Sequence, residues 1–246
     1  MEFYKCHNLG NDFILFYNVN SFVDIKKLCF RKLNIGADGI IFLKKLKDCY
    51  KINIFNKDGS EALCCGNALF CSFKFIFEKL LKKDLKKEIM IKTLSKKALG
   101  LYEKGKICFY IDPPKIIDSF SKKIENKKFN FILVDSGVLH LVSFLKDIDS
   151  LDINYFAKKI KRFFKDGINI NFARIDKEKI FVRTYERGVE EETYSCGTAA
   201  IAVAKAYNFK KRKMAFKYGD IEVFFENDRL KISSNPKIVF KGDLNI

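Results

Sequence analysis

The 246-residue sequence predicts an α+β protein made of two similar halves, each with short strands around a buried helix. Two cysteine segments carry this prediction: Cys65-Gly66-Asn67-Ala68 and Cys196-Gly197-Thr198-Ala199 each follow an acidic stretch and precede an apolar run. The run after Cys65 is hydrophobic almost all round, which is typical of a helix buried on every side. The order of elements around the two segments is the same, which indicates an internal duplication.

The first half alternates short apolar runs with turn sequences. Strands are predicted where β-branched and aromatic residues dominate: 3–6, 13–17, 40–43, 50–55, 89–93, 98–102 and 106–111. Helices are predicted for residues 24–33 and for the run from Ala68 to Leu81. The glycine-containing turn at residues 8–12 is either a plain hairpin or a place where backbone and asparagine groups meet a ligand.

The second half repeats this plan after Pro113-Pro114, the strongest punctuation in the chain and the predicted domain boundary. The halves are therefore 1–114 and 115–235, and residues 236–246 are a candidate for a return to the first half. Predicted strands are 129–134, 140–144, 169–175, 180–185, 214–217, 221–225 and 230–233, and predicted helices are 151–164 and 199–209.

The net charge of +17 comes from forty lysines and seven arginines, which outnumber thirty acidic residues and are scattered along the whole chain. Proteins that read bases or phosphates favour arginine for its planar, bidentate fork. The lysine excess thus favours a solvated surface over a nucleic-acid face. A basic nucleic-acid-binding protein is kept as the alternative from a different functional class.

Neither a membrane span nor a secretory signal is apparent, so a cytoplasmic protein is expected. The eight cysteines are irregularly spaced and are expected to be reduced thiols. No paired Cys-x-x-Cys spacing supports a metal site, and only two histidines are present. Six of the cysteines are expected to be small buried hydrophobic residues.

Cys65 and Cys196 differ from the others because each directly precedes a predicted helix. The first N–H groups of a helix lack intrahelical partners, and the helix dipole places partial positive charge there. Both effects favour thiolate over thiol and lower the pKa of the cysteine. Two such cysteines, one from each half, indicate a pair that handles one proton from two sides.

Six motifs, taken in order, resemble the diaminopimelate epimerase family and cover essentially the whole chain. They are Gly10-Asn11-Asp12-Phe13, Gly36-Ala37-Asp38-Gly39, Asn56-Lys57-Asp58-Gly59-Ser60-Glu61, Cys65-Gly66-Asn67, Tyr185-Glu186-Arg187-Gly188 and Cys196-Gly197-Thr198. Each motif alone is weak, but six in register are specific. The wider relatives are two-cysteine racemases and epimerases that need no cofactor, such as proline racemase and histidine racemase.

The resemblance implies two pseudo-symmetric halves, each a mostly antiparallel β-barrel around a central helix, with the active site in the cleft between them. It also implies a homodimer with no cofactor and no metal. Cys65 and Cys196 match the catalytic pair, while His140 and Glu186 match the residues that support it. The substrate-contacting positions match Asn11, Asn56, Gly66, Asn67, Asn169, Glu186, Arg187, Gly197 and Thr198.

The implied reaction is epimerisation of LL-2,6-diaminopimelate to the meso form, for lysine and peptidoglycan precursor synthesis. One cysteine removes the α-proton as thiolate, and the other donates a proton to the opposite face as thiol. The N–H groups after each cysteine would hold the α-carboxylate. His140 and Glu186 would tune the cysteines and contact the α-amino group, and Arg187 would bind the distal carboxylate.

Two departures from the family pattern concern the substrate. Val138 stands where some relatives have an asparagine that holds the far end of the substrate, and Gly39 stands where some have glutamine. Both leave the reaction type intact. A racemase of the same scaffold that acts on another amino acid, such as histidine or lanthionine, is therefore the alternative function.

Overall fold

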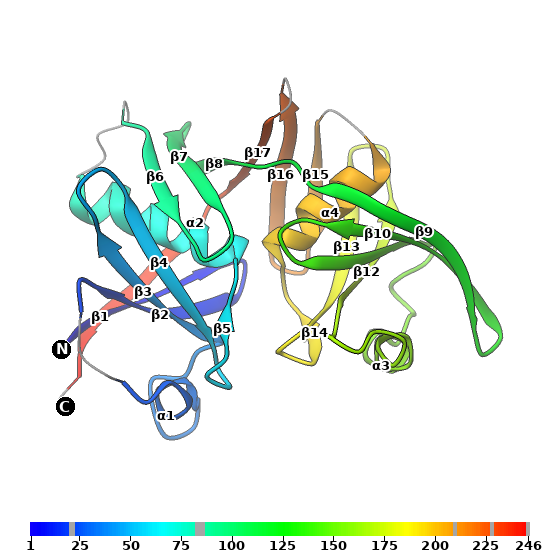
Figure 1. Cartoon of the computed structure of the whole chain (residues 1–246), viewed down its shortest axis with the longest axis horizontal. Helices are drawn as coiled ribbons and strands as arrows, with labels where there is room; N and C mark the ends of the chain where they lie inside the picture. Colours follow the sequence, from blue (N-terminus) through cyan, green and yellow to red (C-terminus); the bar gives the residue numbers. More distant parts are fainter. Residues whose placement is uncertain (20–22, 82–86, 209–210, 227–228, 245–246) are drawn as a thin grey trace. The chain divides into compact units, whose positions relative to one another are not determined.

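The computed structural model describes residues 1–19, 23–81, 87–208, 211–226 and 229–244, which fall into two compact units (Figure 1). Unit 1 is Met1–Asp112 with Ser233–Ile246, and unit 2 is Pro113–Ile232. Unit 2 thus begins at a proline, which has a fixed φ and no backbone N–H to donate to a strand partner. Among the described helices, none has both the length and the apolar character of a membrane span.

Unit 1 is built mainly from strands. Its elements in chain order are β1 (Glu2–Asn8), β2 (Asn11–Tyr17), α1 (Ile25–Cys29), β3 (Gly39–Lys45), β4 (Tyr50–Asn56), β5 (Glu61–Ala62), α2 (Gly66–Phe75), a π-helical turn η1 (Ile76–Leu80), β6 (Ile89–Lys92), β7 (Lys97–Glu103), β8 (Lys106–Ile111) and β18 (Lys237–Asp243). The strands pair in the order β18-β1-β2-β3-β4-β6-β7-β8, with the β2–β3 and β4–β6 pairs parallel.

Helix α2 is the centre of unit 1. Every residue of the helix except Lys74 is buried, and the helix contacts β1, β2, β3, β7, β8 and β18. The strand layer therefore wraps around it, as the all-round apolar run predicts. Among the described strands β18 and β8 are not paired with each other, so the strand layer does not close into a barrel through that pair.

Unit 2 repeats this plan. Its elements are β9 (Lys115–Ile124), β10 (Lys127–Asp135), β11 (Leu139–Phe144), α3 (Ile153–Lys161), β12 (Asn169–Ile175), β13 (Lys179–Glu186), β14 (Glu191–Thr193), α4 (Gly197–Tyr207), β15 (Lys211–Phe216) and β16 (Gly219–Glu226), followed by β17 (Arg229–Ser234), which ends in unit 1. The order is β9-β10-β11-β12-β13-β15-β16, with β11–β12 and β13–β15 parallel. Helix α4 contacts β9 to β13, β15 and β16.

The order β18 to β7 in unit 1 matches the order β9 to β16 in unit 2, with parallel pairs at the same two places, so one motif is used twice. The first strand of the motif is the difference. In unit 2 it is β9, which directly precedes β10. In unit 1 it is β18, which returns from the C-terminal end of the chain to pair with β1.

Several elements differ from the sequence prediction. The short strands β5 and β14 are additional to it, and α3 is shorter than the predicted 151–164. Strand β9 was not predicted, because most of its side chains are exposed and its long pairing with β10 is not visible in the sequence. Helix α1 is shorter than 24–33, since Phe30 is already extended and Leu33 is exposed. The predicted helix that ends at Phe209 is described to Tyr207, and Phe209 lies outside the described residues.

Candidate active site

Both candidate catalytic cysteines are the N-cap residues of the central helices. Cys65 has φ −144° and ψ 118° before α2, and Cys196 has φ −139° and ψ 118° before α4. In each unit, a strand of two or three residues that pairs with the preceding long strand leads into the cysteine. The duplicated fold thus presents two thiols in the same backbone conformation, each at a helix N-terminus.

The surroundings of the two thiols differ. Cys65 is half-buried, while Cys196 is buried. The Cys196 Sγ accepts a hydrogen bond from the Ala199 N–H at 3.4 Å and lies 3.2 Å from the Thr198 hydroxyl oxygen. Cys64 is buried as a packed neighbour, and burial raises the pKa of its thiol to about 11. The position at the helix N-terminus therefore belongs to Cys65, as the motif register predicts.

In unit 1, a chain of hydrogen-bonded side chains reaches the N-terminus of α2. The Ser234 hydroxyl donates to Asn8 at 2.7 Å, the Asn8 amide to Asn67 at 2.9 Å, the Asn67 amide to Asn11 at 3.2 Å and the Asn11 amide to Asp38 at 3.2 Å. The side chain of Asn67 is 1% exposed and is engaged at both its oxygen and its nitrogen. The Asn67 side chain therefore ties the N-terminus of α2 to β1 and β2.

An ion cluster fixes the glycine-containing turn to the loop before β3. Asp12 receives the Lys5 ammonium at 2.7 Å and the Arg31 guanidinium at 2.5 Å, and Arg31 also reaches Asp38 at 2.7 Å. Burial raises the pKa of Asp12, but the hydrogen bonds from Arg31 and Lys5 outweigh it and leave the pKa at about 2. Burial, followed by the Asp12 charge, raises the pKa of Asp38. The cluster holds Asn11 in place.

In unit 2, the candidate residues lie on neighbouring strands. His140 on β11 is the register partner of Asn169 on β12, and β13 ends at Glu186. Asn169 donates to the Leu139 carbonyl at 3.1 Å and accepts the Arg187 backbone N–H at 3.0 Å. Asn169 therefore ties the start of β11 to the turn that carries Arg187.

His140 is completely buried, and desolvation by burial lowers the pKa of its imidazole to about 3. It is therefore neutral at physiological pH. The Asn171 amide nitrogen lies 3.0 Å from its Nδ1. Its Nε2 is buried and has no hydrogen-bond partner among the described residues.

Glu186 and Arg187 are held by different contacts. The Thr193 hydroxyl donates to the Glu186 carboxylate at 2.7 Å. The exposed Arg187 side chain donates to the Asp166 carbonyl at 3.0 Å, and its stem runs so close to Gly167 that a Cβ there would lie 2.9 Å from it. A glycine at 167 thus leaves room for the arginine to lie along this loop.

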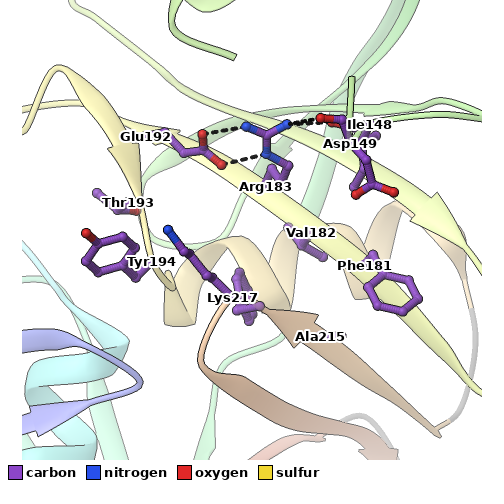
Figure 2. Close-up of a pocket in the computed structure, with 11 residues that line it drawn as sticks. Ile148, Asp149, Phe181, Val182, Arg183, Glu192, Thr193, Tyr194, Ala215 and Lys217 are labelled. Carbon is purple, nitrogen blue, oxygen red and sulfur yellow. Dashed lines mark hydrogen bonds and ion pairs between the residues drawn. The ribbon is translucent and has the colours of Figure 1, made fainter. Parts of the chain in front are cut away.

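A pocket of about 510 Å³ lies beside β14 and contains none of the candidate catalytic residues (Figure 2). Its upper wall is the ion pair of Arg183 and Glu192, whose two N–O distances are 2.6 and 2.7 Å. The same guanidinium donates to the Ile148 carbonyl at 2.6 Å. The pair fastens β14 to β13 and so positions Thr193, which holds Glu186.

The structure also describes the candidate residue Asn56 and positions 39 and 138, where the sequence departs from the family pattern. Asn56 is half-buried and donates to the Ser60 hydroxyl at 2.9 Å. Its register partner is Gly39, where a Cβ would lie 2.5 Å from the Phe55 carbonyl oxygen. This backbone therefore has no room for a glutamine at position 39. Val138 accepts the Ser136 N–H at 3.1 Å through its backbone carbonyl.

Within each unit, the structure groups the predicted residues. It joins Asn11 to Asn67 in unit 1, and it joins Asn169 to Arg187 in unit 2. Sequence reasoning missed the residues that hold them: Asn8, Asp38, Asn171, Thr184 and Thr193. A usable signal was present, because Asn8 and Asn171 are polar residues in otherwise apolar strands. All eight cysteines are free thiols, and the described residues include no cluster of three or more potential metal ligands.

Solved structures that share this fold include a racemase and an epimerase. A probable proline racemase from Agrobacterium radiobacter K84 superposes with a TM-score of 0.77 at 12% identity, covering 100% of this chain and 93% of that one. A hydroxyproline epimerase from Agrobacterium vitis gives 0.74 at 13% identity, with 98% and 91% covered. At such identities the likeness is one of fold.

The sequence comparisons define the family. Residues 3–116 and 132–237 match diaminopimelate epimerase, and the chain belongs to that family of isomerases. The diaminopimelate epimerases of Methanocella arvoryzae and Archaeoglobus fulgidus are each 32% identical to it, over 274 and 272 residues. Each alignment covers 100% of this chain and 97% of the relative. The resemblance drawn from the six motifs is confirmed.

Proposed function

We propose that this chain converts LL-2,6-diaminopimelate to the meso form without a cofactor, using Cys65 and Cys196 as its two bases. The observation that carries the proposal is the matched pair of N-cap cysteines, one in each copy of a duplicated motif. The curated relatives that align over the whole chain bear the name diaminopimelate epimerase, which supports the substrate.

The proton transfers follow from the chemistry of a thiolate and a thiol on opposite faces of one α-carbon. The thiolate takes the α-proton and becomes a thiol, and the electron pair remains on the substrate as a carbanion. The other thiol gives its proton to the opposite face and becomes a thiolate. The roles exchange in the reverse direction, so neither cysteine is permanently acid or base.

The carbanion needs stabilisation as it develops, and helix N-termini can supply it. Backbone N–H groups at Gly66-Asn67 and at Gly197-Thr198 would receive the α-carboxylate, into which the negative charge flows. The buried, fully engaged side chain of Asn67 favours a backbone contact at that position. The Glu186 carboxylate would accept the α-ammonium.

The distal end of the substrate would be held by the polar residues of both units. Arg187 is exposed and its guanidinium contacts a carbonyl rather than a carboxylate in this structure. A bidentate, charge-assisted bond to a substrate carboxylate would be stronger than that contact. Asn56 and Asn169 would add hydrogen bonds to the distal amino-acid group.

The decisive measurement is exchange of the α-proton of LL-diaminopimelate in deuterated water without added cofactor. Product formed early should carry deuterium at the inverted carbon. The Cys65→Ala and Cys196→Ala variants should each lose racemisation, whereas Cys49→Ala, a half-buried thiol outside the candidate site, serves as the matched control. Normal turnover by either of the first two variants contradicts the two-base proposal.

A second candidate substrate class is another amino acid, and Gly39 motivates it. Because no side chain fits at position 39, a substrate contact that glutamine supplies in some relatives is missing here. A panel of diaminopimelate, histidine and lanthionine, read by chiral chromatography, separates the two. Preference for histidine would reject the first substrate and keep the mechanism.

The cellular setting follows from the proposed reaction. The meso product is a precursor of lysine and of peptidoglycan, so we infer that the enzyme works in the cytoplasm.

We also infer a homodimer, since Val239 and Phe240 on β18 are 57% and 48% exposed. Light scattering of the purified protein checks this state. A lack of salt-sensitive binding to DNA or RNA would agree with the scattered lysines and oppose the nucleic-acid alternative.

A further inference from the structure

The sheet of unit 2 has one apolar face and one face with buried polar groups. On β11, β12 and β13, the residues that form a core with α3 are Leu141, Ile170, Phe172 and Tyr185. Side chains alternate along a strand, so His140, Asn171 and Thr184 lie on the opposite face. That face is covered by α4, which contacts β11, β12 and β13. All three polar side chains have zero exposure.

The orientation of the Asn171 amide is fixed by its neighbours. Its nitrogen lies 2.9 Å from the Leu141 carbonyl oxygen, and its oxygen lies 3.0 Å from the Thr184 hydroxyl. The reversed amide would bring two acceptor oxygens together at 2.9 Å in a buried place. The nitrogen must therefore face the carbonyl, and Thr184 donates to the amide oxygen.

The fixed amide determines the protonation of His140. One amide hydrogen goes to the Leu141 carbonyl, so the other points to His140 Nδ1 at 3.0 Å. Nδ1 must then be an acceptor and carry no proton. In a neutral imidazole, the single proton is consequently on Nε2. Burial, which lowers the pKa of His140 to about 3, keeps the ring neutral.

The remaining observation concerns Nε2, which is fully buried and has no partner among the described residues. A buried donor left without a partner costs about 1–3 kcal/mol. Such a cost is understandable where the donor awaits a group that arrives during the reaction. An N–H can serve an anionic acceptor, such as a carboxylate or a thiolate, but it cannot accept from an ammonium.

We propose that Asn171 is a positioning residue that locks His140 in the neutral tautomer protonated on Nε2. His140 then donates one hydrogen bond to an anionic acceptor in the reaction and is neither a general base nor a ligand of the α-ammonium. The role of His140 as a donor in the reaction rests on the proposed function, whereas its tautomer does not. This role refines the one expected for His140, because the α-ammonium is then left to Glu186.

The tautomer can be measured directly by long-range ¹H–¹⁵N NMR of histidine-labelled protein. The chain has only two histidines, and His7→Gln assigns the second. The wild type should show a bare Nδ1 and a protonated Nε2, unchanged from pH 8 to pH 5. A protonated Nδ1 in the wild type overturns the proposal.

Two variants test whether Asn171 is responsible. Asn171→Ala should allow both tautomers, so that the two nitrogen signals move toward each other. Asn171→Asp, which keeps the shape of the side chain, should draw the proton to Nδ1 because a carboxylate accepts. If the tautomer stays as in the wild type in the folded variants, Asn171 is not the lock. Ser143→Ala removes a buried hydroxyl on β11, the strand of His140; it is the control and should change neither spectrum nor activity.

Steady-state kinetics then connect the tautomer to the reaction. Removing one preorganised donor costs about 10²–10³ in rate in enzymes where it has been measured. Because the donor is misdirected rather than deleted, kcat of Asn171→Asp should fall at least about 10-fold, with KM little changed. A rise in KM of about the same factor, with kcat unchanged, would indicate a role in substrate binding and contradict the proposal. Absence of any epimerase activity in the wild type would refute the proposed function and leave the NMR result standing.

Discussion

The buried, neutral His140 makes the stability of this protein depend on pH in a window that can be calculated. The pKa of the imidazole is 6.5 in the unfolded chain and about 3 in the fold. Between these values the unfolded chain binds a proton that the native state refuses, so stability falls as the pH drops below about 6.5 and the loss is complete near pH 3. One unit of pKa corresponds to about 1.4 kcal/mol. From pH 7 to pH 5, this group alone should therefore remove about 2 kcal/mol of unfolding free energy.

The assay is urea unfolding followed by circular dichroism at pH 7, 6 and 5, on the wild type and on His140→Gln. Other titrating groups, including Asp12 and Asp38, contribute equally to both proteins and cancel in the difference. The wild type should lose about 2 kcal/mol more than the variant over this interval. Two curves that remain parallel from pH 7 to pH 5 would show that the native imidazole protonates normally, and the reasoning from burial would be wrong.

Three further changes have definite expected outcomes. Gly100→Ala should lower the urea-derived unfolding free energy by about 1–3 kcal/mol through overpacking, because a Cβ there would lie 2.1 Å from the Phe73 ring; no change would mean that the ring moves freely. Thr193→Val removes the 2.7 Å bond to Glu186 and should reduce kcat while the melting temperature changes little; unchanged kcat would show that Glu186 needs no such support. Asn8→Leu breaks the buried chain that joins Ser234, Asn8 and Asn67, so it should lower the unfolding free energy by about 1–3 kcal/mol and speed proteolysis near Ser234, and equal cleavage rates in variant and wild type would argue against that coupling.

Much of the fold was predictable because local physical signals agreed with the final structure. The alternation of residues 50–55 became β4, and the all-round apolar run became α2, buried in its wrapping strands. The missed strand has a clear physical cause. Strand β9 has exposed side chains and exists through pairing with β10, so its residues carry no hydrophobic pattern to detect.

The candidate residues were found by motif, but how they are held was not. Cys65 and Cys196 could be recognised from the Cys-Gly pairs ahead of apolar runs. The hydrogen bonds that fix the tautomer of His140 could not be recognised, since Asn171 and Thr184 are 31 and 44 residues away from His140 along the chain. Their contacts depend on strand register, and a shift of one residue would turn each side chain to the other face.

The sequence by itself determined the duplicated plan, the two N-cap cysteines and the family, because these depend on residue type and spacing along the chain. Only the tertiary structure decided which side chains of the site are available. The Asn67 side chain is hydrogen-bonded to Asn8 and Asn11, while the buried Nε2 of His140 has no hydrogen-bond partner among the described residues. The physical reason is that hydrogen-bond partners and desolvation are set by neighbours in space, which strand pairing brings together from distant parts of the chain.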